Sequence, residues 1–565
     1  MPYRAPLSEI EFMLDHVVGM NRVAETELFA EASSETVHAI LSEAGKMCEE
    51  VLSPLQRIGD LHPAKLENGV VRTSPGFGEG YRAIAEGGYV AITASPEFGG
   101  LGLPQSVATA VNEMIGSACL SLQLNPLMTQ GQIEALEHHA SDEIKELYLP
   151  KLVSGEWCGT MNLTEPQAGS DVGALTSKAE DNGDGTYAIS GQKIYISWGD
   201  NDFSENVCHL VLARLPDAPA GTKGISLFLV PKRLPDAQGN AGVANTLKVV
   251  SLEHKLGLHG SPTCVMQYDG ATGWMIGEPH KGMAAMFTMM NNARLGVGVQ
   301  GLSVAEAAYQ HALAFASERK QGRGMVEGGT GTILDHADVR RMLAGMKAQV
   351  FAARAIALDL AVSIDLARAT DDAAMKARAA FLTPICKAYG TETGIAVSNE
   401  GVQVHGGMGF VEETGAAQFL RDVRVTAIYE GTNGIQAMDL VGRKMMDGGD
   451  AAISLIDEIE ETARNAENAP LAEAAQALRS ATERLVSLQM NDRFAGAVPY
   501  CMAFATALGA HYHLRASLAQ GEGSMHSRLA QVFVARHLPK VAGWLVEAGH
   551  GAADLYALSP EDFAA

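Results

Sequence analysis

The sequence predicts a mainly α-helical protein with an inserted β-domain and an additional helical domain at its C-terminal end. Over most of the chain, apolar residues recur at intervals of three and four, which is the spacing of a buried helix face. Between about residues 158 and 280 this spacing gives way to short apolar runs bounded by turn sequences such as DNGDG, a pattern typical of strands. The predicted order is helices, strands, helices and a further helical tail.

This order suggests four domains. Helical spacing in the first part covers 10–18, 34–56 and 104–152, with a glycine-rich loop at 94–104. Strands are expected at 187–197, 209–215 and 224–231, and later helices at 339–350, 372–403 and 412–425. The expected domains are an N-terminal helical domain at 1–157, a middle β-domain at 158–281, a C-terminal helical bundle at 282–444 and an additional helical domain at 445–565.

Composition makes several classes of protein unlikely candidates. The 565 residues are 47% hydrophobic, enough for sizeable cores, and carry a net charge of −24. The tail from Met445 to Ala565 has 15 acidic and 8 basic residues, so nucleic-acid binding is disfavoured by charge repulsion. There is no apolar run of 18 or more residues, and acidic residues interrupt the N-terminal segment. Neither a membrane span nor a secretory signal is therefore expected.

The spacing of the cysteines and glycines argues against several kinds of metal, disulfide and cofactor site. Seven cysteines are scattered without a CxxC pair or zinc-finger spacing, so no disulfide framework or metal site is expected and a reducing cytoplasm fits. No GxGxxG sequence follows a strand, which argues against a Rossmann fold and NAD. The HGGMG sequence holds no serine or cysteine, so it is not a hydrolase nucleophile elbow.

Three motifs together point to a reaction. They are LTEPQAGSD at 163–171, VQVHGGMGF at 402–410 and IYEGTNGIQ at 428–436. Their order and spacing resemble the acyl-CoA dehydrogenase family of flavoproteins, from roughly residue 85 to 440. The resemblance implies a β-barrel-like middle domain and a C-terminal four-helix bundle. The first residues and the tail beyond 445 are similar to a long subfamily whose members act on 3-(methylthio)propanoyl-CoA.

The resemblance implies an FAD-dependent α,β-dehydrogenation of an acyl-CoA to the 2-enoyl-CoA. Glu430, in the YEGT segment, would take the α-proton while a hydride passes to flavin N5. Some family members carry the base on an earlier helix, where this chain has Ala293, so Glu430 is the expected base. A carboxylate between flavin and acyl chain would be desolvated, which raises its pKa and strengthens it as a base.

By the same resemblance, other residues are expected to bind FAD and the CoA thioester. Some also have a purely structural interpretation: Arg319 could cap helix carbonyls, and Tyr195 could be ordinary strand packing. Two positions depart from the family pattern, Ala337 for a common glutamine and Asn291 for a common aspartate. The expected cofactor-binding residues are Met161, Leu163, Thr164, Ser170, Tyr195, Ser197, Arg319, Gln321, Gln403, Gly406, Gly407, Thr432 and Asn433, and the substrate-binding residues are Ser170, Asn291, Arg294 and Gly431.

The expected partners are the acyl-CoA substrate, an electron-transfer flavoprotein as electron acceptor and at least one further copy of the chain. In the family, the Arg319, Gln321 and 403–407 segments complete the FAD site of a neighbouring subunit. A short acyl chain such as 3-(methylthio)propanoyl is expected. The alternatives are a medium- or long-chain acyl-CoA dehydrogenase, an acyl-CoA oxidase that reacts with oxygen, and a non-catabolic relative that binds DNA.

Overall fold

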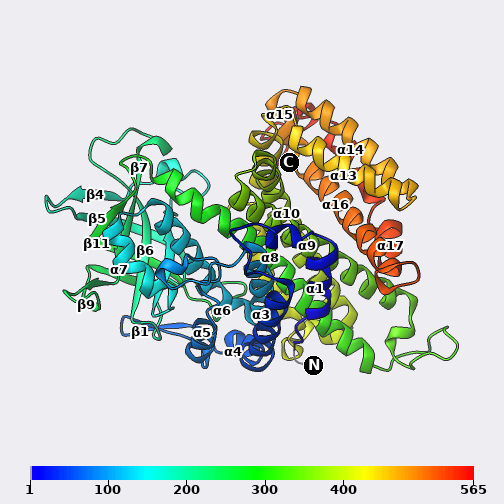
Figure 1. Ribbon diagram of the computed structural model, residues 1–565, viewed down its shortest axis with the longest axis horizontal. Helices are drawn as coiled ribbons and strands as arrows, with labels where there is room; N and C mark the ends of the chain where they lie inside the picture. The colour runs from blue at the N-terminus through cyan, green and yellow to red at the C-terminus, as the bar shows by residue number, and fades with distance from the viewer. Residues whose placement is uncertain (1–2) are drawn as a thin grey trace.

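The computed structural model describes residues 3–565 and confirms a mainly helical molecule with a central β-domain (Figure 1). In Figure 1 the strands lie on the left, the long bundle helices in the middle and the C-terminal helices at the upper right. The first part contains α1 (Leu7–His16), α2 (Asn21–Ala24), α3 (Ser34–Met47), α4 (Ser53–Leu61), α5 (Phe77–Glu86), α6 (Gln105–His139), α7 (Asp142–Val153) and the hairpin β1 (Lys65–Glu67) and β2 (Val70–Arg72).

The β-domain closes into a small barrel. Strand β11 pairs with β5 and β7, β5 pairs with β4, and β6 pairs with both β4 and β7, which completes a ring. Buried and less buried residues alternate along much of β11, whereas β6 and β7 are buried along almost their whole length. The strands are β3 (Trp157–Asn162), β4 (Lys178–Asp181), β5 (Tyr187–Ser197), β6 (Asn206–Arg214), β7 (Ile225–Pro231), β8 (Arg233–Pro235), β9 (Ala241–Ala244), β10 (Leu247–Leu252) and β11 (Thr263–Ile276).

Three long helices form the centre of the bundle: α8 (Gly282–Glu318), α9 (Ala337–Thr370) and α10 (Ala373–His405). Helices α8 and α10 cross at glycines, because a Cβ on Gly390 would lie 2.4 Å from the carbonyl oxygen of Gly298. Gly394 makes a similar approach to the Gly301 carbonyl, with its Cβ at 2.6 Å. The two backbones therefore come closer than any side chain would allow.

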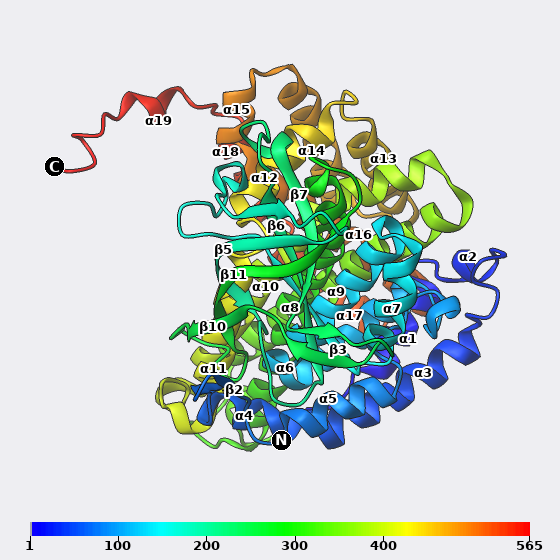
Figure 2. The ribbon, with the colours of Figure 1, turned by 90° about the vertical axis from the view of Figure 1, so that its left-hand side faces the viewer.

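The remaining helices follow α10 in sequence. The bundle ends with α11 (Ala416–Val423) and α12 (Asn433–Val441). Figure 2 shows α19 leading away from the body of the molecule towards the C-terminus. The tail consists of α13 (Asp450–Asn465), α14 (Ala469–Ser487), α15 (Met490–Ala495), α16 (Ala497–Gln520), α17 (Met525–Arg536), α18 (Lys540–Ala548) and α19 (Ala553–Ala557).

Two expectations about local structure need correction. The LTEPQAGSD segment follows strand β3, whereas the sequence pattern placed it before the strands of the β-domain. Strand β3 is almost wholly buried on both faces, so it lacks the alternation that identifies a half-exposed strand. Residues 412–425 are not one helix but a 3₁₀ turn at Glu412–Thr414, helix α11 and a second 3₁₀ turn at Arg424–Ala427.

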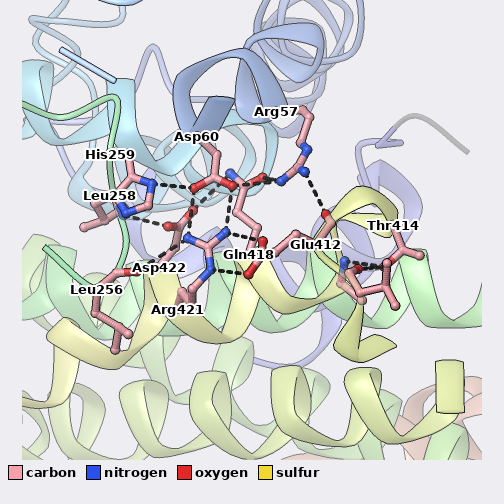
Figure 3. A network of polar contacts seen from close by, with 12 residues as sticks. Arg57, Asp60, Leu256, Leu258, His259, Glu412, Thr414, Gln418, Arg421 and Asp422 are labelled. Atoms are coloured by element: carbon pink, nitrogen blue, oxygen red, sulfur yellow. Dashed lines mark hydrogen bonds and ion pairs between the residues drawn. The ribbon is translucent and has the colours of Figure 1, made fainter. Parts of the chain in front are cut away.

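A polar junction joins the first part, the β-domain and the bundle (Figure 3). Asp60 of α4 accepts hydrogen bonds from Arg57 at 2.8 Å and from the two terminal nitrogens of Arg421 at 2.9 and 2.7 Å. The ring of His259 lies 2.8 Å from the same carboxylate. Asp422, beside Arg421 on α11, accepts the backbone N–H of Leu258 at 2.6 Å. These contacts hold the loop at 256–259 against α11.

Buried charges attach the terminal helices to the bundle. Arg354 of α9 is fully buried and donates to Glu113 of α6, to Glu306 of α8 and to Glu9 of α1. On the other side of α9, Asp359 accepts a 2.6 Å hydrogen bond from Tyr512 of the tail. None of the helices within residues 3–565 combines the length and apolar character needed to cross a bilayer.

Candidate active site

The side chain of Glu430 is presented on a left-handed turn just before α12. Its φ is +56°, and that of Gly431 is +84°. A left-handed backbone at a residue with a Cβ is strained and is found most often at functional sites, where surrounding contacts enforce it. Two such contacts are present: the side-chain amide of Gln436 donates to the Glu430 carbonyl at 3.1 Å, and the Thr432 hydroxyl caps α12 by accepting from the N–H of Ile435 at 3.3 Å.

The charge environment of Glu430 suits a base. Burial raises the pKa of the Glu430 carboxyl to about 7, while the positive charges of Arg294 and Lys387 favour its ionised form. A carboxyl poised near neutrality can take a proton at neutral pH and is a stronger base than an ordinary glutamate. Ala293, at the alternative base position, is a buried methyl side chain.

Arg294 and Lys387 come from the two helices that cross at glycines. Arg294 lies on α8, four residues before Gly298, and Lys387 lies on α10, three residues before Gly390. The close crossing therefore brings two cations from distant parts of the sequence to one carboxylate. Burial lowers the pKa of Lys387 to about 8, opposed by the negative charge of Glu430.

A series of side chains runs from the turn that carries Glu430 to α6. The hydroxyl of Tyr429 donates to the side-chain carbonyl of Gln300, and the Gln300 amide donates to Gln123 at 3.0 Å. Gln123 follows a break in α6 at Cys119, where φ is −157° and ψ is 88°. The indole of Trp198, at the end of β5, donates to the Ser121 carbonyl at 3.1 Å in the same segment. The turn that carries Glu430, the middle of α6 and the end of β5 are thus joined by these hydrogen bonds.

The sequence-predicted residues of the β-domain gather at the ends of β3 and β5. The backbone N–H of Ile194 donates to the Thr164 carbonyl at 2.9 Å, and the ammonium of Lys193 donates to the Leu163 carbonyl at 3.0 Å. Lys193 also pairs with Glu165 at 2.9 Å in a fully buried ion pair. Met161 lies at the end of β3, and Ser197 ends β5.

Tyr195 is turned outward by an irregularity in β5. The pairing with β11 shifts register between Cys264 and Met266, opposite the segment that contains Tyr195. Tyr195 takes a φ of +60° and is 61% exposed, although its neighbour Ile196 is buried. A bulge of this kind commonly re-aims a side chain beside an active site. An outward aromatic face next to the 163–170 loop fits the flat ring of a flavin.

A third group of predicted residues lies far from the first two. Arg319 ends α8, and its guanidinium donates to Gln321 at 3.3 Å. The ring of His405, in the 403–407 segment, stacks on Phe315 of α8 with centroids 4.4 Å apart. From Arg294 to Arg319 the chain advances 25 residues along α8, which corresponds to roughly 37 Å. One subunit therefore does not bring this group to Glu430.

The third group has the character of a phosphate site. Gln403, Gly406 and Gly407 are exposed, and nothing lies within 4 Å of where a Cβ on either glycine would be. Open glycine backbone allows the N–H groups to approach an anion closely, and arginine suits phosphate. The ring of His405 is buried, and its Nδ1–H donates to the Gly401 carbonyl at 2.7 Å, so its role is packing.

The remaining predicted residues are placed as follows. Asn291 is exposed on α8, one turn before Arg294, and Ser170 is exposed on the loop after β3. Asn433 is the first residue of α12 and donates to Glu392 at 2.8 Å. Gly431 and Thr432 directly follow Glu430 in the same left-handed turn before α12.

Several residues that the structure places around the site were not predicted from the sequence. They are charged or amide side chains in otherwise apolar helix or strand segments, such as Lys387 in FLTPICKAYG and Lys193 in QKIYIS. A single lysine within an apolar run is itself a signal, because a lysine is rarely fully buried without a partner. Gln300, Gln436 and Glu165 show a weaker signal of the same kind.

Comparisons with known proteins agree with this arrangement. Family models described as the N-terminal, middle and C-terminal domains of acyl-CoA dehydrogenase match residues 34–156, 160–271 and 280–446. A model described as acetyl-CoA dehydrogenase C-terminal like matches residues 455–559.

Among relatives, 3-methylmercaptopropionyl-CoA dehydrogenase of Ruegeria pomeroyi is 48% identical over 80% of this chain and 78% of its own length. A butyryl-CoA dehydrogenase of Syntrophomonas wolfei is 35% identical over 77% of this chain and 74% of its own length. The fold is similar to that of an acyl-CoA dehydrogenase complexed with FAD from Bacillus anthracis, with a TM-score of 0.75, 20% identity and coverage of 98% of this chain and 93% of the other.

Proposed function

The chain belongs to the acyl-CoA dehydrogenase family, and from this premise we propose that it oxidises a short acyl-CoA, with 3-(methylthio)propanoyl-CoA as the preferred substrate, to the 2-enoyl-CoA. The observation that carries the proposal is the left-handed turn at Glu430, where a half-buried carboxylate, whose pKa burial raises to about 7, lies within the electrostatic influence of Arg294 and Lys387. The proposed substrate follows the relative that is 48% identical and bears that substrate in its name.

Members of this family bind FAD, so FAD is the cofactor of this chain. When bound, FAD supplies the acceptor for the hydride that leaves the β-carbon. We assign the ring to the face made by the 163–170 loop, Tyr195 and Ser197, and the phosphates to Arg319, Gln321 and the 403–407 segment of a neighbouring subunit.

In the proposed reaction Glu430 takes the α-proton of the thioester. The electron pair of that C–H bond becomes the second bond between the α- and β-carbons, and the β-carbon loses hydrogen with its electron pair. The backbone N–H of Glu430 donates to the thioester oxygen, where negative charge develops as the α-proton leaves. Arg294, the residue after Ala293 on α8, supports the charged form of Glu430 in the resting enzyme.

The electrons leave the enzyme by an electron-transfer flavoprotein in this proposal. An acyl-CoA oxidase of the same fold would instead form hydrogen peroxide in air. Substrate-dependent formation of hydrogen peroxide in air, without any added electron acceptor, would show that the protein is an oxidase rather than a dehydrogenase. The seven cysteines are free, buried thiols, which supports a reducing cytoplasm as the location.

The test of the base is Glu430→Gln. The amide keeps the shape of the side chain but cannot take a proton, so we expect at least about a hundredfold loss of turnover with flavin still bound. Turnover is measured with an artificial electron acceptor, and bound flavin is measured by absorbance. Near-normal turnover of the purified variant would show that Glu430 is not the base.

The test of the substrate is a panel of methylthiopropanoyl-, butanoyl-, octanoyl-, palmitoyl- and phenylpropanoyl-CoA. Each methylene in a fitted pocket changes the free energy of binding by only about 1–3 kcal/mol, so kcat/KM should be graded across the panel. We expect the highest kcat/KM for methylthiopropanoyl-CoA or an unbranched chain of similar length. A steady rise from butanoyl- to palmitoyl-CoA would instead indicate a long-chain enzyme.

A further inference from the structure

Lys387 is a buried lysine beside the catalytic turn, and the reaction proposed above does not use it. Its side chain is 0% exposed, at the middle of α10. Its ammonium donates to the Gly431 carbonyl at 2.9 Å and to the side-chain carbonyl of Asn433 at 2.9 Å. Both partners lie within three residues of Glu430, so Lys387 holds the chain directly after the base.

The acceptors of Lys387 are themselves fixed to α10. The side-chain amide of Asn433 donates to Thr391 at 3.0 Å and to Glu392 at 2.8 Å, one turn after Lys387. The turn is therefore tied to α10 by a closed set of hydrogen bonds. This matters because Glu430 is strained at a φ of +56°, and a strained residue keeps its conformation only when its surroundings enforce it.

Lys387 also places a buried positive charge near Glu430. A buried ammonium is costly unless acceptors and an opposite charge compensate for lost water. Two carbonyl oxygens accept from it, and Glu430 and Glu392 supply negative charge nearby.

From these contacts we propose that Lys387 is a positioning residue for the base, which anchors the catalytic turn to α10 and favours the charged form of the Glu430 carboxylate. The inference rests on the function proposed above and adds to it a residue that touches neither substrate nor cofactor.

The charges that face this site come from several elements. The charge of Arg294 of α8 also acts on Glu430, and Asp439 of α12 and Arg443 after it act in turn on Arg294. The hydroxyl of Tyr429 is kept protonated by burial, since burial and the charge of Glu430 both raise its pKa. Loss of Lys387 would leave Arg294 as the main cation at Glu430, so the pKa of Glu430 should rise.

Two substitutions separate the charge of Lys387 from its hydrogen bonds. Lys387→Gln removes the charge and keeps a donor, and Lys387→Arg keeps the charge. Lys376→Gln is the matched control, because Lys376 lies on the same helix but is exposed and pairs with Asp371 near the helix start. None of these changes removes a group that contacts substrate in the proposed reaction.

The protonation of Glu430 is measured directly, by infrared difference spectra of the flavin-loaded protein across pH, with Glu430→Gln as the blank in each background. We expect the midpoint to rise by about one pH unit in Lys387→Gln, since a nearby opposite charge shifts a carboxyl pKa by that order. Lys387→Arg and Lys376→Gln should keep the midpoint of the unmodified protein. The acidic limb of kcat/KM should move with the infrared midpoint.

An unchanged midpoint in Lys387→Gln would overturn the inference, as would an equal shift in Lys376→Gln. If Lys387→Gln does not retain flavin, Lys387→Arg decides the matter: an upward shift of its midpoint despite the retained charge overturns the proposal, and an unchanged midpoint supports it. Failure of the proposed function would look different. The unmodified protein would then turn over no acyl-CoA, while the infrared titration would still report on Glu430.

Discussion

At the scale of single residues, the ionisation of Glu430 is the property that matters most. Its pKa of about 7 lies well above the ordinary value for glutamate, near 4.3. Between these values the folded protein holds a proton that the unfolded chain does not, so stability falls as the pH rises through this window. The charged base therefore costs stability above neutral pH, which is the usual trade between stability and activity.

The first prediction concerns pH. We expect kcat/KM to rise with pH along an acidic limb with a midpoint near 7, because only the carboxylate of Glu430 takes a proton. Glu430→Gln should also raise the thermal midpoint of the protein at about pH 8 and leave it nearly unchanged at about pH 4, below both pKa values. The rates and the melting curves are measured in the same buffers. An acidic limb near 4.5 would show that the carboxyl is not desolvated.

At the scale of elements, the loop after β3 depends on one ion pair. Glu165 accepts from Lys193, from the N–H groups of Thr176 and Ser177, and from both of their hydroxyls. Although burial acts to raise the pKa of Glu165, the charge and hydrogen bonds of Lys193 lower it to about 2. The Glu165 carboxylate thus braces the 163–170 loop, which is assigned to the flavin.

We predict that Glu165→Gln destabilises this loop strongly. Lys193 would keep a buried charge without its partner, which costs about 3 kcal/mol or more. We expect a lower urea midpoint and loss of flavin on dilution. Asp269→Asn is the control, because its pair with Lys248 is exposed on both sides, and the expected change is below about 0.5 kcal/mol. Equal effects of the two substitutions would refute the assigned role of the buried pair.

At the scale of the whole molecule, the two halves of the FAD site are separated along α8. Arg319 lies roughly 37 Å from Arg294 along the axis of α8, and the 403–407 segment packs near the Arg319 end through His405 and Phe315. Each complete site would therefore combine the β-domain face of one copy with the Arg319 end of another. Binding of FAD and assembly are then linked, because FAD binds only the assembled form.

The third prediction follows from that linkage. The purified protein should be at least a homodimer, and Arg319→Ala should lower the flavin content while leaving the residues around Glu430 intact. Light scattering gives the assembly state, and absorbance gives the flavin-to-protein ratio. The matched control is Arg479→Ala, at a half-exposed arginine of the tail that is paired with Asp457 and Glu460. A fully flavin-loaded monomer would contradict the shared site.

The order of the domains and the choice of Glu430 as the proposed base both came from the sequence. Periodicity indicated helices, strands and helices again, and the YEGT segment with Ala293 at the other base position singled out Glu430. The helical class, the closed barrel and the family are confirmed. The exact domain boundaries and the roles of the individual site residues stay predictions. Strand β3 was missed because a strand buried on both faces shows no alternation.

The sequence by itself singled out the residues that we propose carry the chemistry, since a motif is a local pattern of residue types. Only the tertiary structure decided how strong a base Glu430 is, because its pKa depends on burial and on Arg294 and Lys387, which lie 136 and 43 positions away in the chain. Arg294 and Lys387 come close to Glu430 because α8 and α10 cross at glycines. No local sequence pattern predicts which glycines will face each other. Electrostatic energy depends on distance in space, so it becomes defined only when the fold does.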